Sequence, residues 1–352
     1  MSSRQVEPSP DAQVWVLDDP RAGTSAQAIG IAERLGVPFR RIPLSWNWMA
    51  HVAGLARRGS LIGLAHPGRG MDDHSPAFAR AFNPGVSLLA PPPGGEGPRL
   101  VISSGSRSAA VALWLKQRFA CHLVHCMSPG LGGLLRADAY DLLVLPEHDN
   151  PPRQSNVFPV LGAPHRVSPL ALRHAAGAWH ERLAHLPRPH VALMVGGPVR
   201  GSDMQPSLAH ALGRKVARLT LARGGSVLAS TSRRTGTEAS DALAAGLSRA
   251  MHVLYRWGEP GENPYLGFLA SADAVVVTAD SVSMLSEACA TAAPVFAALP
   301  EMAGVRHRRL MAALFAGGHA RPLRDHLDAW PRTRLDEAGR VAAEILRRFQ
   351  LD

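Results

Sequence analysis

Small and hydroxyl-bearing residues follow an apolar strand pattern that ends near residue 277, and they lead into a helix pattern. The first turn of such a helix leaves backbone N–H groups free, and these groups bind phosphate together with the helix dipole. Ser281 and Ser283 would add hydroxyl donors. Glu287, one turn inside the helix, is placed to accept hydrogen bonds from two ribose hydroxyls. The segment therefore indicates a diphosphate and ribose site, or simply an N-capped helix with a solvated glutamate.

Two further loops follow predicted strands in the same half of the chain. One contains Gly196 and Gly197, which would let a ligand approach the backbone closely. The other, residues 230–236, contains Arg233 and Arg234, and either guanidinium could neutralise a phosphate by bidentate contact. Each loop alone is equally compatible with a turn or a solvated surface. Because the carboxyl ends of parallel strands meet at one edge of a sheet, we expect the three loops to open onto one cleft.

The first half of the chain has two Gly/Ser turns that lead into predicted helices. They could bind a sugar or a phosphate at the helix N-termini, or only cap those helices. Neither matches the Walker pattern, because no Gly-Lys-Ser/Thr follows, which argues against a nucleoside triphosphatase. The candidate residues of these turns are Asp19, Arg21, Gly23, Gln27, Ser104, Gly105 and Arg107.

Three polar residues, Glu147, His148 and Asp149, follow another apolar run, and His165 lies further along the chain. Neighbouring carboxylate and imidazole groups can perform acid/base chemistry, and they can also be part of a metal site. A polar loop held by local hydrogen bonds would have the same composition. All three interpretations fit these residues.

The elements that would position these residues alternate between strand and helix. In the first half, strand patterns at 14–17, 100–102, 122–124 and 142–145 combine with helix patterns at 25–35 and 108–119. The second half repeats this order, with strands at 191–195, 226–229, 253–255, 274–277 and 294–298 and helices at 207–223, 237–251 and 283–291. Parallel strands with crossover helices are the simplest architecture. We predict an α/β protein of two Rossmann-like domains facing a ligand cleft.

The domain boundary is predicted from the length of the chain and from a proline-bounded helix pattern. A chain of 352 residues is long enough for two domains. A helix pattern at 169–185 is followed by Pro187 and Pro189 and separates the halves. These features predict an N-terminal domain at 1–168, a linker helix at 169–189 and a C-terminal domain at 190–352.

The net charge of +10 raises the question of a nucleic-acid partner. Lys116 and Lys215 are the lysines of the chain, so nearly all the positive charge is arginine, as in proteins of high-GC bacteria. The arginines are scattered and lack interleaved aromatic residues, which makes a nucleic-acid partner unlikely. Attraction to an anionic membrane surface or to sugar phosphates fits the same charge.

The sequence has neither a membrane-spanning apolar window nor a signal peptide, which predicts a cytoplasmic protein or one peripheral to the inner membrane. Three cysteines, Cys121, Cys126 and Cys289, are too few and too unevenly placed for a disulfide framework. A zinc site could be formed by Cys121, His122, His125 and Cys126. Strand alternation would place these ligands on opposite faces, so we expect no metal there.

The segments above together resemble the elongated-mitochondria (ELM) family, which is named for a plant mitochondrial-fission factor and whose bacterial members are described as candidate glycosyltransferases. The resemblance covers nearly the whole chain. It rests on residues 19–27, 102–108, 146–149, 156, 162–167, 196–198, 230–236, 263–265 and 278–287. Residues 278–287 are also similar to the donor site of the enzyme that adds N-acetylglucosamine to lipid I, in which a glutamate matching Glu287 binds ribose.

The resemblance implies a glycosyltransferase B fold and a UDP-sugar donor, and we expect no obligate cofactor. The leading hypothesis is transfer of a sugar from a nucleoside-diphosphate donor to an envelope glycolipid or polysaccharide, with the helix N-terminus and arginine balancing the diphosphate charge in place of a metal. The alternatives are a nucleotide-sugar epimerase of the same fold and a non-catalytic scaffold at a membrane.

Each candidate residue has an expected role under this hypothesis. The donor-binding residues are Gly196, Gly197, Ser232, Arg233, Arg234, Asn263, Asp280, Ser281, Ser283, Met284 and Glu287. The acceptor-side residues are Arg21, Gly23, Gln27, Ser104, Gly105, Arg107, Glu147 and His165. The catalytic candidates are Asp19 and His148.

Two segments depart from the family pattern. Thr24 stands where family members usually carry a histidine, directly after the loop glycine. Ser128, Pro129 and Gly130 replace the usual Asp-Pro-Arg. If the family histidine is the base, Asp19 or His148 must substitute for it here, or transferase activity is lost.

Overall fold

The computed structural model describes residues 11–46, 64–65, 89–91, 95–130, 134, 136–198 and 204–349. The chain divides into two compact units. Unit 1 comprises residues 1–166 and 337–352, and unit 2 comprises residues 167–336. Each unit is built on one six-stranded parallel sheet.

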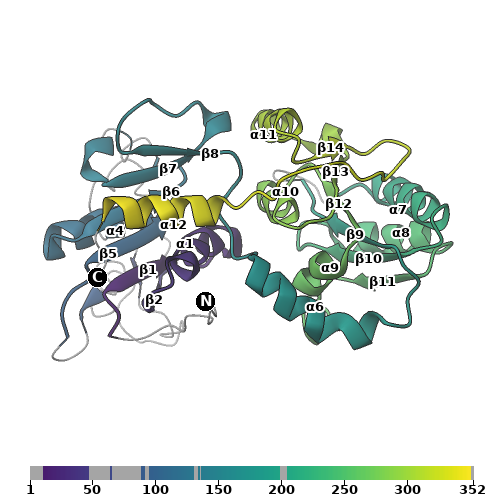
Figure 1. Ribbon diagram of the computed structural model, residues 1–352, viewed down its shortest axis with the longest axis horizontal. Coiled ribbons are helices and arrows are strands. Elements are labelled where there is room, and N and C mark those ends of the chain that lie inside the picture. The colour runs from purple at the N-terminus through teal and green to yellow at the C-terminus, as the bar shows by residue number, and fades with distance from the viewer. Residues whose placement is uncertain are drawn as a thin grey trace, which may run out of the picture. The chain divides into compact units, whose positions relative to one another are not determined.

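The sheet of unit 1 has the strand order β2-β1-β5-β6-β7-β8 (Figure 1). Its strands are β1 (Val14–Asp18), β2 (Phe39–Pro43), β5 (Leu100–Ser104), β6 (His122–Cys126), β7 (Leu142–Pro146) and β8 (Val157–Val160). Its helices are α1 (Ala22–Leu35), α4 (Ser108–Phe119) and α12 (Glu337–Arg348), with the short 3-10 turns η2 (Ala137–Ala139) and η3 (Glu147–Asp149). A two-stranded antiparallel pair, β3 (Ser45–Trp46) and β4 (Leu64–Ala65), stands apart from this sheet.

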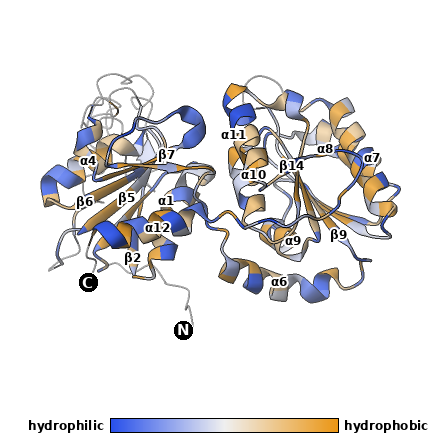
Figure 2. Ribbon diagram, turned by 45° about the horizontal axis from the view of Figure 1, so that its top comes forward, coloured by the Kyte–Doolittle hydropathy of each residue, from blue (hydrophilic) through white to orange (hydrophobic). Residues whose placement is uncertain are grey.

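Both faces of the unit 1 sheet are buried, which is why apolar residues dominate its central strands (Figure 2). Alternate residues of β1 point to opposite faces, so Val14 and Val16 pack against α1 and α12, and Trp15 and Leu17 pack on the α4 side. Helix α12 buries an i, i+3, i+4, i+7 stripe beside α1. That stripe consists of Ala338, Val341, Ala342 and Ile345.

The sheet of unit 2 has the strand order β11-β10-β9-β12-β13-β14. Its strands are β9 (His190–Val195), β10 (Ser226–Thr231), β11 (His252–Tyr255), β12 (Ala274–Thr278), β13 (Val295–Ala298) and β14 (Arg321–Pro322). Its helices are α6 (Pro169–Leu183), α7 (Pro206–Leu221), α8 (Thr237–Leu247), α9 (Tyr265–Ser271), α10 (Val282–Cys289) and α11 (Val305–Ala316), with the 3-10 turn η4 (Pro300–Met302). Helices α7 and α8 share one hydrophobic core with the strands.

The predicted domain division differs from the structure at both ends of the second domain. Residues 337–352 were assigned to the C-terminal domain, but α12 belongs to unit 1, because its apolar stripe is buried against α1. The predicted linker helix belongs to unit 2. Trp179 of α6 packs edge-on against Phe268 of α9, with ring centroids 5.7 Å apart.

The strands missing from the sequence prediction lie at sheet edges. β2 and β8 form the two edges of the unit 1 sheet, and β14 is an edge of the unit 2 sheet. An edge strand is only partly covered, so exposed and buried residues mix along it and the apolar pattern weakens. The central strands were predicted correctly because burial on both faces gives each of them an apolar run.

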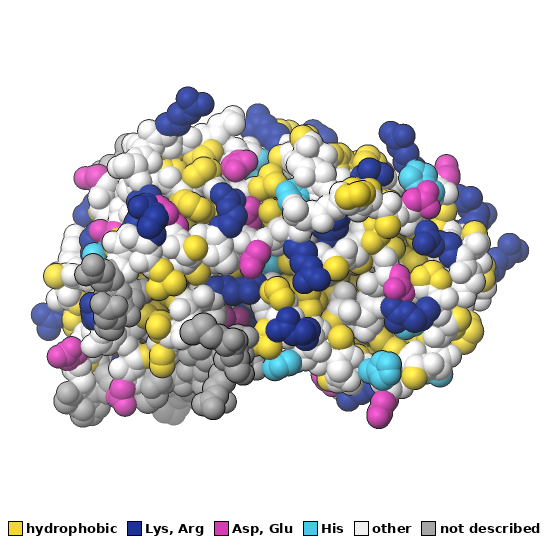
Figure 3. Space-filling view, in the orientation of Figure 1, with side chains coloured by type: hydrophobic (Ala, Val, Ile, Leu, Met, Phe, Trp, Pro, Cys, Tyr) yellow, Lys and Arg dark blue, Asp and Glu magenta, His cyan; other side chains and the backbone are white. Residues whose placement is uncertain are grey.

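Within the described part of the chain, no helix has the length and apolar character needed to cross a bilayer. Cys121, Cys126 and Cys289 are buried free thiols. His122 and His125 point to different environments, since His122 is exposed and His125 is fully buried beside Ser103. Figure 3 shows the arginine and lysine side chains spread over the face in view, without a single continuous basic patch.

Candidate functional site

Three candidate loops of unit 2 follow neighbouring strands. β10, β9 and β12 are adjacent in the sheet and parallel, so their carboxyl ends share one edge. The loop containing Gly196 follows β9, the turn containing Arg234 follows β10, and Asp280 follows β12. The structure thus brings the three loops together, and hydrogen bonds join them.

Gly196 and Gly197 both form hydrogen bonds and close contacts with other residues of the protein. Gly196 donates its backbone N–H to Thr278 Oγ1 at 2.8 Å, and Gly197 donates to Asp280 Oδ2 at 2.8 Å. A Cβ on Gly196 would lie 2.2 Å from Asp280 Oδ2, and one on Gly197 would lie 2.0 Å from the carbonyl oxygen of Arg234. At both positions the absence of a Cβ leaves room for a neighbouring loop of the protein. The sequence interpretation had instead predicted that the glycines leave room for a ligand.

Asp280 lies at the centre of these contacts and is 1% exposed. Its Oδ2 accepts from Gly197 and lies 3.4 Å from Arg234 Nη2. Its Oδ1 is buried and has no hydrogen-bond partner among the described residues. A buried carboxylate oxygen without a donor is unfavourable, so Oδ1 marks a position where a hydrogen-bond donor would be stabilised.

The turn after β10 is fixed from several sides. Arg234 Nη1 donates to the carbonyl oxygen of Gly197 at 2.7 Å, and Thr235 Oγ1 donates to that of Gly196 at 2.6 Å. Ser232 Oγ accepts from the backbone N–H of Arg234 at 3.3 Å. The guanidinium of Arg234 is thus held in place before any ligand binds, whereas Arg233 is exposed.

Helix α10 begins at this edge with a side-chain cap. Ser281 Oγ accepts from the backbone N–H of Met284 at 3.3 Å, and the first intrahelical bond runs from Leu285 N to the carbonyl oxygen of Ser281 at 3.1 Å. The N–H groups of Val282 and Ser283 precede that first bond, which is where an anion is stabilised at a helix N-terminus. The structure is therefore compatible with both an N-capped helix and a diphosphate site. The helix is capped, and its first turn retains N–H groups for a diphosphate.

Glu287 is half-buried and accepts a 2.6 Å hydrogen bond at Oε2 from the hydroxyl of Tyr265. Loss of hydration raises the pKa of Glu287 to about 7, and the bond from Tyr265 partly opposes the rise. Burial also raises the pKa of Tyr265 well above its usual value. Tyr265 was not among the predicted site residues, although it is the last residue of the family motif at 263–265, and its N–H donates to Asn263 Oδ1 at 3.0 Å.

His307 is a second residue that the sequence interpretation missed. It lies half-buried in the first turn of α11, which follows β13, the neighbour of β12. Burial lowers the pKa of His307, with the charge of Asp280 opposing that shift and the charges of Arg234 and Arg306 reinforcing it. No helix was predicted at these residues.

The catalytic and acceptor-side candidates lie in unit 1. Asp19 follows β1 and is 2% exposed, and Arg21 forms an ion pair with its carboxylate. Arg21 Nε lies 2.9 Å from Asp19 Oδ1, and Arg21 Nη2 lies 3.2 Å from Oδ2. The bond to Asp19 raises the pKa of Arg21.

His148 lies in η3 after β7, and β5 and β6 separate β7 from β1. Three inter-strand spacings of about 4.8 Å place the ends of β1 and β7 roughly 14 Å apart. Asp19 and His148 are therefore alternatives for a base and are too far apart for a directly bonded pair. Glu147 is exposed in the same turn.

The remaining candidate residues of unit 1 form contacts within that unit. Gly105 has φ +80°, and a Cβ there would lie 2.8 Å from Thr24 Cγ2, so the side chain at position 24 faces the loop after β5. Gln27 is buried with Nε2 3.4 Å from the carbonyl oxygen of Gly23, to which it donates. Ser104 is the last residue of β5, and Arg107 is the N-cap residue of α4. His165 is 2% exposed, and its backbone packs on α1 at Gly30.

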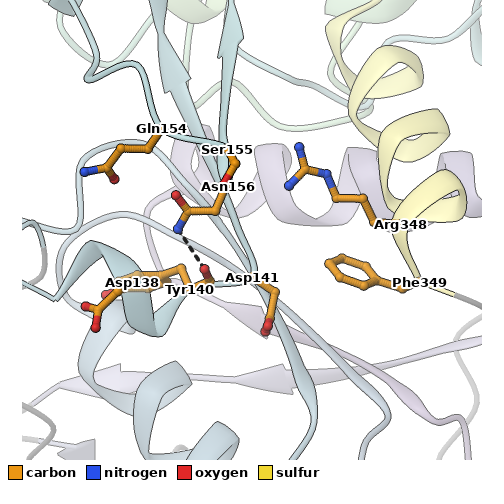
Figure 4. A pocket seen from close by; sticks show the side chains of 8 residues that line it. All are labelled: Asp138, Tyr140, Asp141, Gln154, Ser155, Asn156, Arg348 and Phe349. Carbon is orange, nitrogen blue, oxygen red and sulfur yellow. Dashed lines mark hydrogen bonds between the residues drawn. The ribbon is translucent and has the colours of Figure 1, made fainter.

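A pocket of about 690 Å³ lies elsewhere in unit 1, at the amino ends of β7 and β8 (Figure 4). Asn156, a residue of the family motif, donates there to the carbonyl oxygens of Ala137 at 2.8 Å and Tyr140 at 2.9 Å. Asp141 is paired with Lys116 at 2.6 Å, so this charged residue already has a partner. The role of Asn156 in the fold is therefore to hold η2 and Tyr140.

The chain resembles proteins of known sequence over most of its length. It is 31% identical to mitochondrial fission protein ELM1 of Arabidopsis thaliana over 228 residues, which are 57% of this chain and 51% of the plant protein. The match thus spans about half of the plant protein. It is also 22% identical over 370 residues to an uncharacterized protein of Rickettsia prowazekii, covering 94% of this chain and 97% of the other.

The fold also occurs in solved structures. UDP-GlcNAc 2-epimerase of Methanocaldococcus jannaschii, in complex with UDP-GlcNAc and UDP, superposes with a TM-score of 0.51 at 12% identity, covering 95% of this chain and 98% of the enzyme. This likeness concerns the fold alone, which is the two-domain glycosyltransferase B type. The Mitochondrial fission ELM1 family profile matches residues 22–349. The chain therefore belongs to the mitochondrial fission ELM1 family.

Proposed function

We propose that this protein is a glycosyltransferase that binds a nucleoside-diphosphate sugar, with UDP as the nucleotide, at the carboxyl edge of the unit 2 sheet. The observation that carries the proposal is the arrangement along α10. Its N-terminal turn offers N–H groups for a diphosphate, and Glu287, further along the same helix, offers a carboxylate held by Tyr265 for ribose hydroxyls. The fold supports this assignment, since the epimerase that shares it was solved with UDP-GlcNAc and UDP.

The acceptor in this proposal is an envelope glycolipid or polysaccharide, reached by a cytoplasmic protein that associates peripherally with the inner membrane. The strand ends of unit 1 carry the acceptor-side residues, with Asp19 or His148 as the base. Thr24, beside Gly105, replaces the histidine of the family pattern. Asp19 could act as a base only after releasing Arg21, which makes His148 the simpler choice.

Binding is tested first, by calorimetry with UDP on the wild type and on two glutamate variants. Glu287→Gln keeps the size of the side chain and removes its charge, so we expect UDP affinity to fall by about 10- to 100-fold, the worth of hydrogen bonds to a charged group. Glu181→Gln, at an exposed position of α6, is the matched control and should bind UDP as the wild type does. Equal affinity in all three proteins would remove Glu287 from the site.

The reaction is tested next, with labelled UDP-glucose and UDP-N-acetylglucosamine, each with and without a bacterial membrane extract. Label that enters lipid or polymer only when the extract is present identifies a transferase. Conversion of the donor sugar without any acceptor identifies an epimerase. UDP affinity with neither product would favour a non-catalytic scaffold.

A further inference from the structure

A second candidate binding site lies in unit 1, in the pocket of about 690 Å³ at the amino ends of β7 and β8. That volume is within the range of ligand-binding cavities. Asp19 and His148 follow strands of the same sheet at its opposite, carboxyl edge. The five residues of β7, at about 3.3 Å each, place the pocket roughly 16 Å from the turn that contains His148. Neither the sequence interpretation nor the family resemblance assigns a ligand to this pocket.

We infer that the pocket binds a neutral sugar unit of a glycan, through sugar hydroxyl groups that both donate and accept hydrogen bonds. The inference goes beyond the proposed function, because the pocket belongs to the other unit from the nucleotide site and to the other edge of the sheet from the catalytic candidates. A glycan held here would make a second carbohydrate contact, separate from the reacting sugar.

Three separate segments form the walls of the pocket. One is η2 with the residues that follow it, the second is the segment that precedes β8, and the third is the end of α12. Figure 4 shows the guanidinium of Arg348 and the ring of Phe349 extending from α12 toward the segment that carries Ser155 and Asn156. The ring of Phe349 is stacked on His122, with centroids 4.3 Å apart, so this apolar part of the wall is fixed in position.

The pocket offers both hydrogen-bond donors and hydrogen-bond acceptors. Asn156 Nδ2 donates to two backbone carbonyl oxygens, so Oδ1 of the same side chain remains as an acceptor. The Nη groups of Arg348 and the side chains of Gln154 and Ser155 make no hydrogen bonds with the rest of the described chain. Arginine only donates, an amide oxygen only accepts, and a hydroxyl does both. A sugar ring with several hydroxyls can therefore satisfy all these groups, whereas an ionised phosphate would leave Asn156 Oδ1 without a donor.

The charges around the pocket are balanced, which favours a neutral ligand. Arg348 Nε donates to Glu344 Oε1 at 2.6 Å, and Asp141 Oδ2 lies 2.6 Å from Lys116 Nζ. An ionic ligand would meet no excess of opposite charge and would lose hydration without compensation. The charged lining residues and the groups paired with them are three carboxylates and three cations, namely Asp138, Asp141, Glu344, Lys116, Arg347 and Arg348.

The test is the binding of free sugars to the whole protein, measured by saturation-transfer NMR and by titration. The probes are glucose, galactose, mannose and N-acetylglucosamine, with glucuronic acid as the charged comparison. At least one neutral sugar should bind. Glucuronic acid should bind several-fold more weakly than the best neutral sugar, because its carboxylate meets no excess of positive charge.

Two variants locate the bound sugar. Arg348→Met keeps a long side chain and removes the Nη donors, so the dissociation constant of the sugar should rise about tenfold. Ser155→Trp fills the pocket from an exposed position of its wall and should abolish binding. Arg347→Met is the matched control for Arg348→Met, because Arg347 pairs with the same Glu344 at 2.7 Å and does not line the pocket. The control should bind sugar as the wild type does.

Melting temperatures show whether each variant folds, and Arg348→Met carries the test if Ser155→Trp does not fold. Failure of all four neutral sugars to bind, unchanged affinity in either folded variant, or an equal loss in Arg347→Met would overturn the inference. Tighter binding of glucuronic acid than of every neutral sugar would also overturn it. Absence of UDP binding to the wild type, together with normal sugar binding, would overturn the proposed function and leave this inference intact.

Discussion

At the scale of single residues, the most informative group is Glu287. A glutamate with a pKa near 7 is only partly ionised at neutral pH, and in this case the cause is desolvation beside Tyr265. The ionised form is the one that can accept hydrogen bonds from two ribose hydroxyls. The titration of Glu287 should therefore control nucleotide affinity.

We expect UDP to bind more tightly at pH 8 than at pH 6. With a pKa of about 7, the ionised fraction of Glu287 rises on the order of tenfold between these pH values, and affinity should rise by up to the same factor. Calorimetry at the two pH values measures the change. Glu287→Gln is the control, because any titration of the UDP phosphates persists in that variant. An equal pH dependence in both proteins would show that Glu287 does not contribute.

At the scale of elements, helix α10 carries both parts of the proposed nucleotide site, its N-terminal turn and Glu287. Its N-terminus is capped by Ser281, and its C-terminal end is held by Arg332, whose Nη1 donates to the carbonyl oxygen of Cys289 at 3.1 Å. Arg332 Nη2 also donates to the carbonyl oxygens of Thr291 and Ala293. A helix fixed at both ends presents its first-turn N–H groups in a constant position, which favours anion binding without reorganisation.

We therefore expect UDP binding to survive removal of divalent cations. Backbone N–H groups and arginine, placed at this edge by α10 and the β10 turn, supply the positive charge that a metal ion would otherwise provide. Calorimetry with UDP in excess EDTA and in millimolar Mg²⁺ should give dissociation constants within about threefold of each other. Binding seen only with Mg²⁺ would contradict this arrangement.

At the scale of the whole molecule, the chain builds two units and completes the first with its last described helix. α12 closes the core of unit 1 although the 170 residues of unit 2 precede it. Unit 1 therefore cannot complete its core until the entire chain is available.

Ile345→Ala should destabilise unit 1 alone. Ile345 is fully buried, and removing a buried aliphatic side chain of this size costs about 2 to 5 kcal/mol. Hydrogen exchange followed by mass spectrometry should show faster exchange in peptides from β1, α1 and β5, with unit 2 peptides unchanged. Leu346→Ala, at an exposed neighbouring position, is the control. Equal acceleration in both units would show that they unfold together.

The sequence by itself determined the α/β class, the central strands and the loops that follow them. Burial on both faces gives each of those strands an apolar run, and parallel order places their following loops at one edge. The resemblance to the family, and hence the expectation of the glycosyltransferase B fold, also came from these loops. Local periodicity was sufficient for each of these conclusions.

Only the tertiary structure decided which groups meet. Gly197 and Asp280 are bonded across 83 residues, and Tyr265 bonds Glu287 across 22. No local pattern specifies such partners. The same holds for α12, whose amphipathic stripe indicates burial but not the sheet against which it is buried. Periodicity shows that a side chain is covered, whereas its partner depends on chain paths that meet only in the folded state.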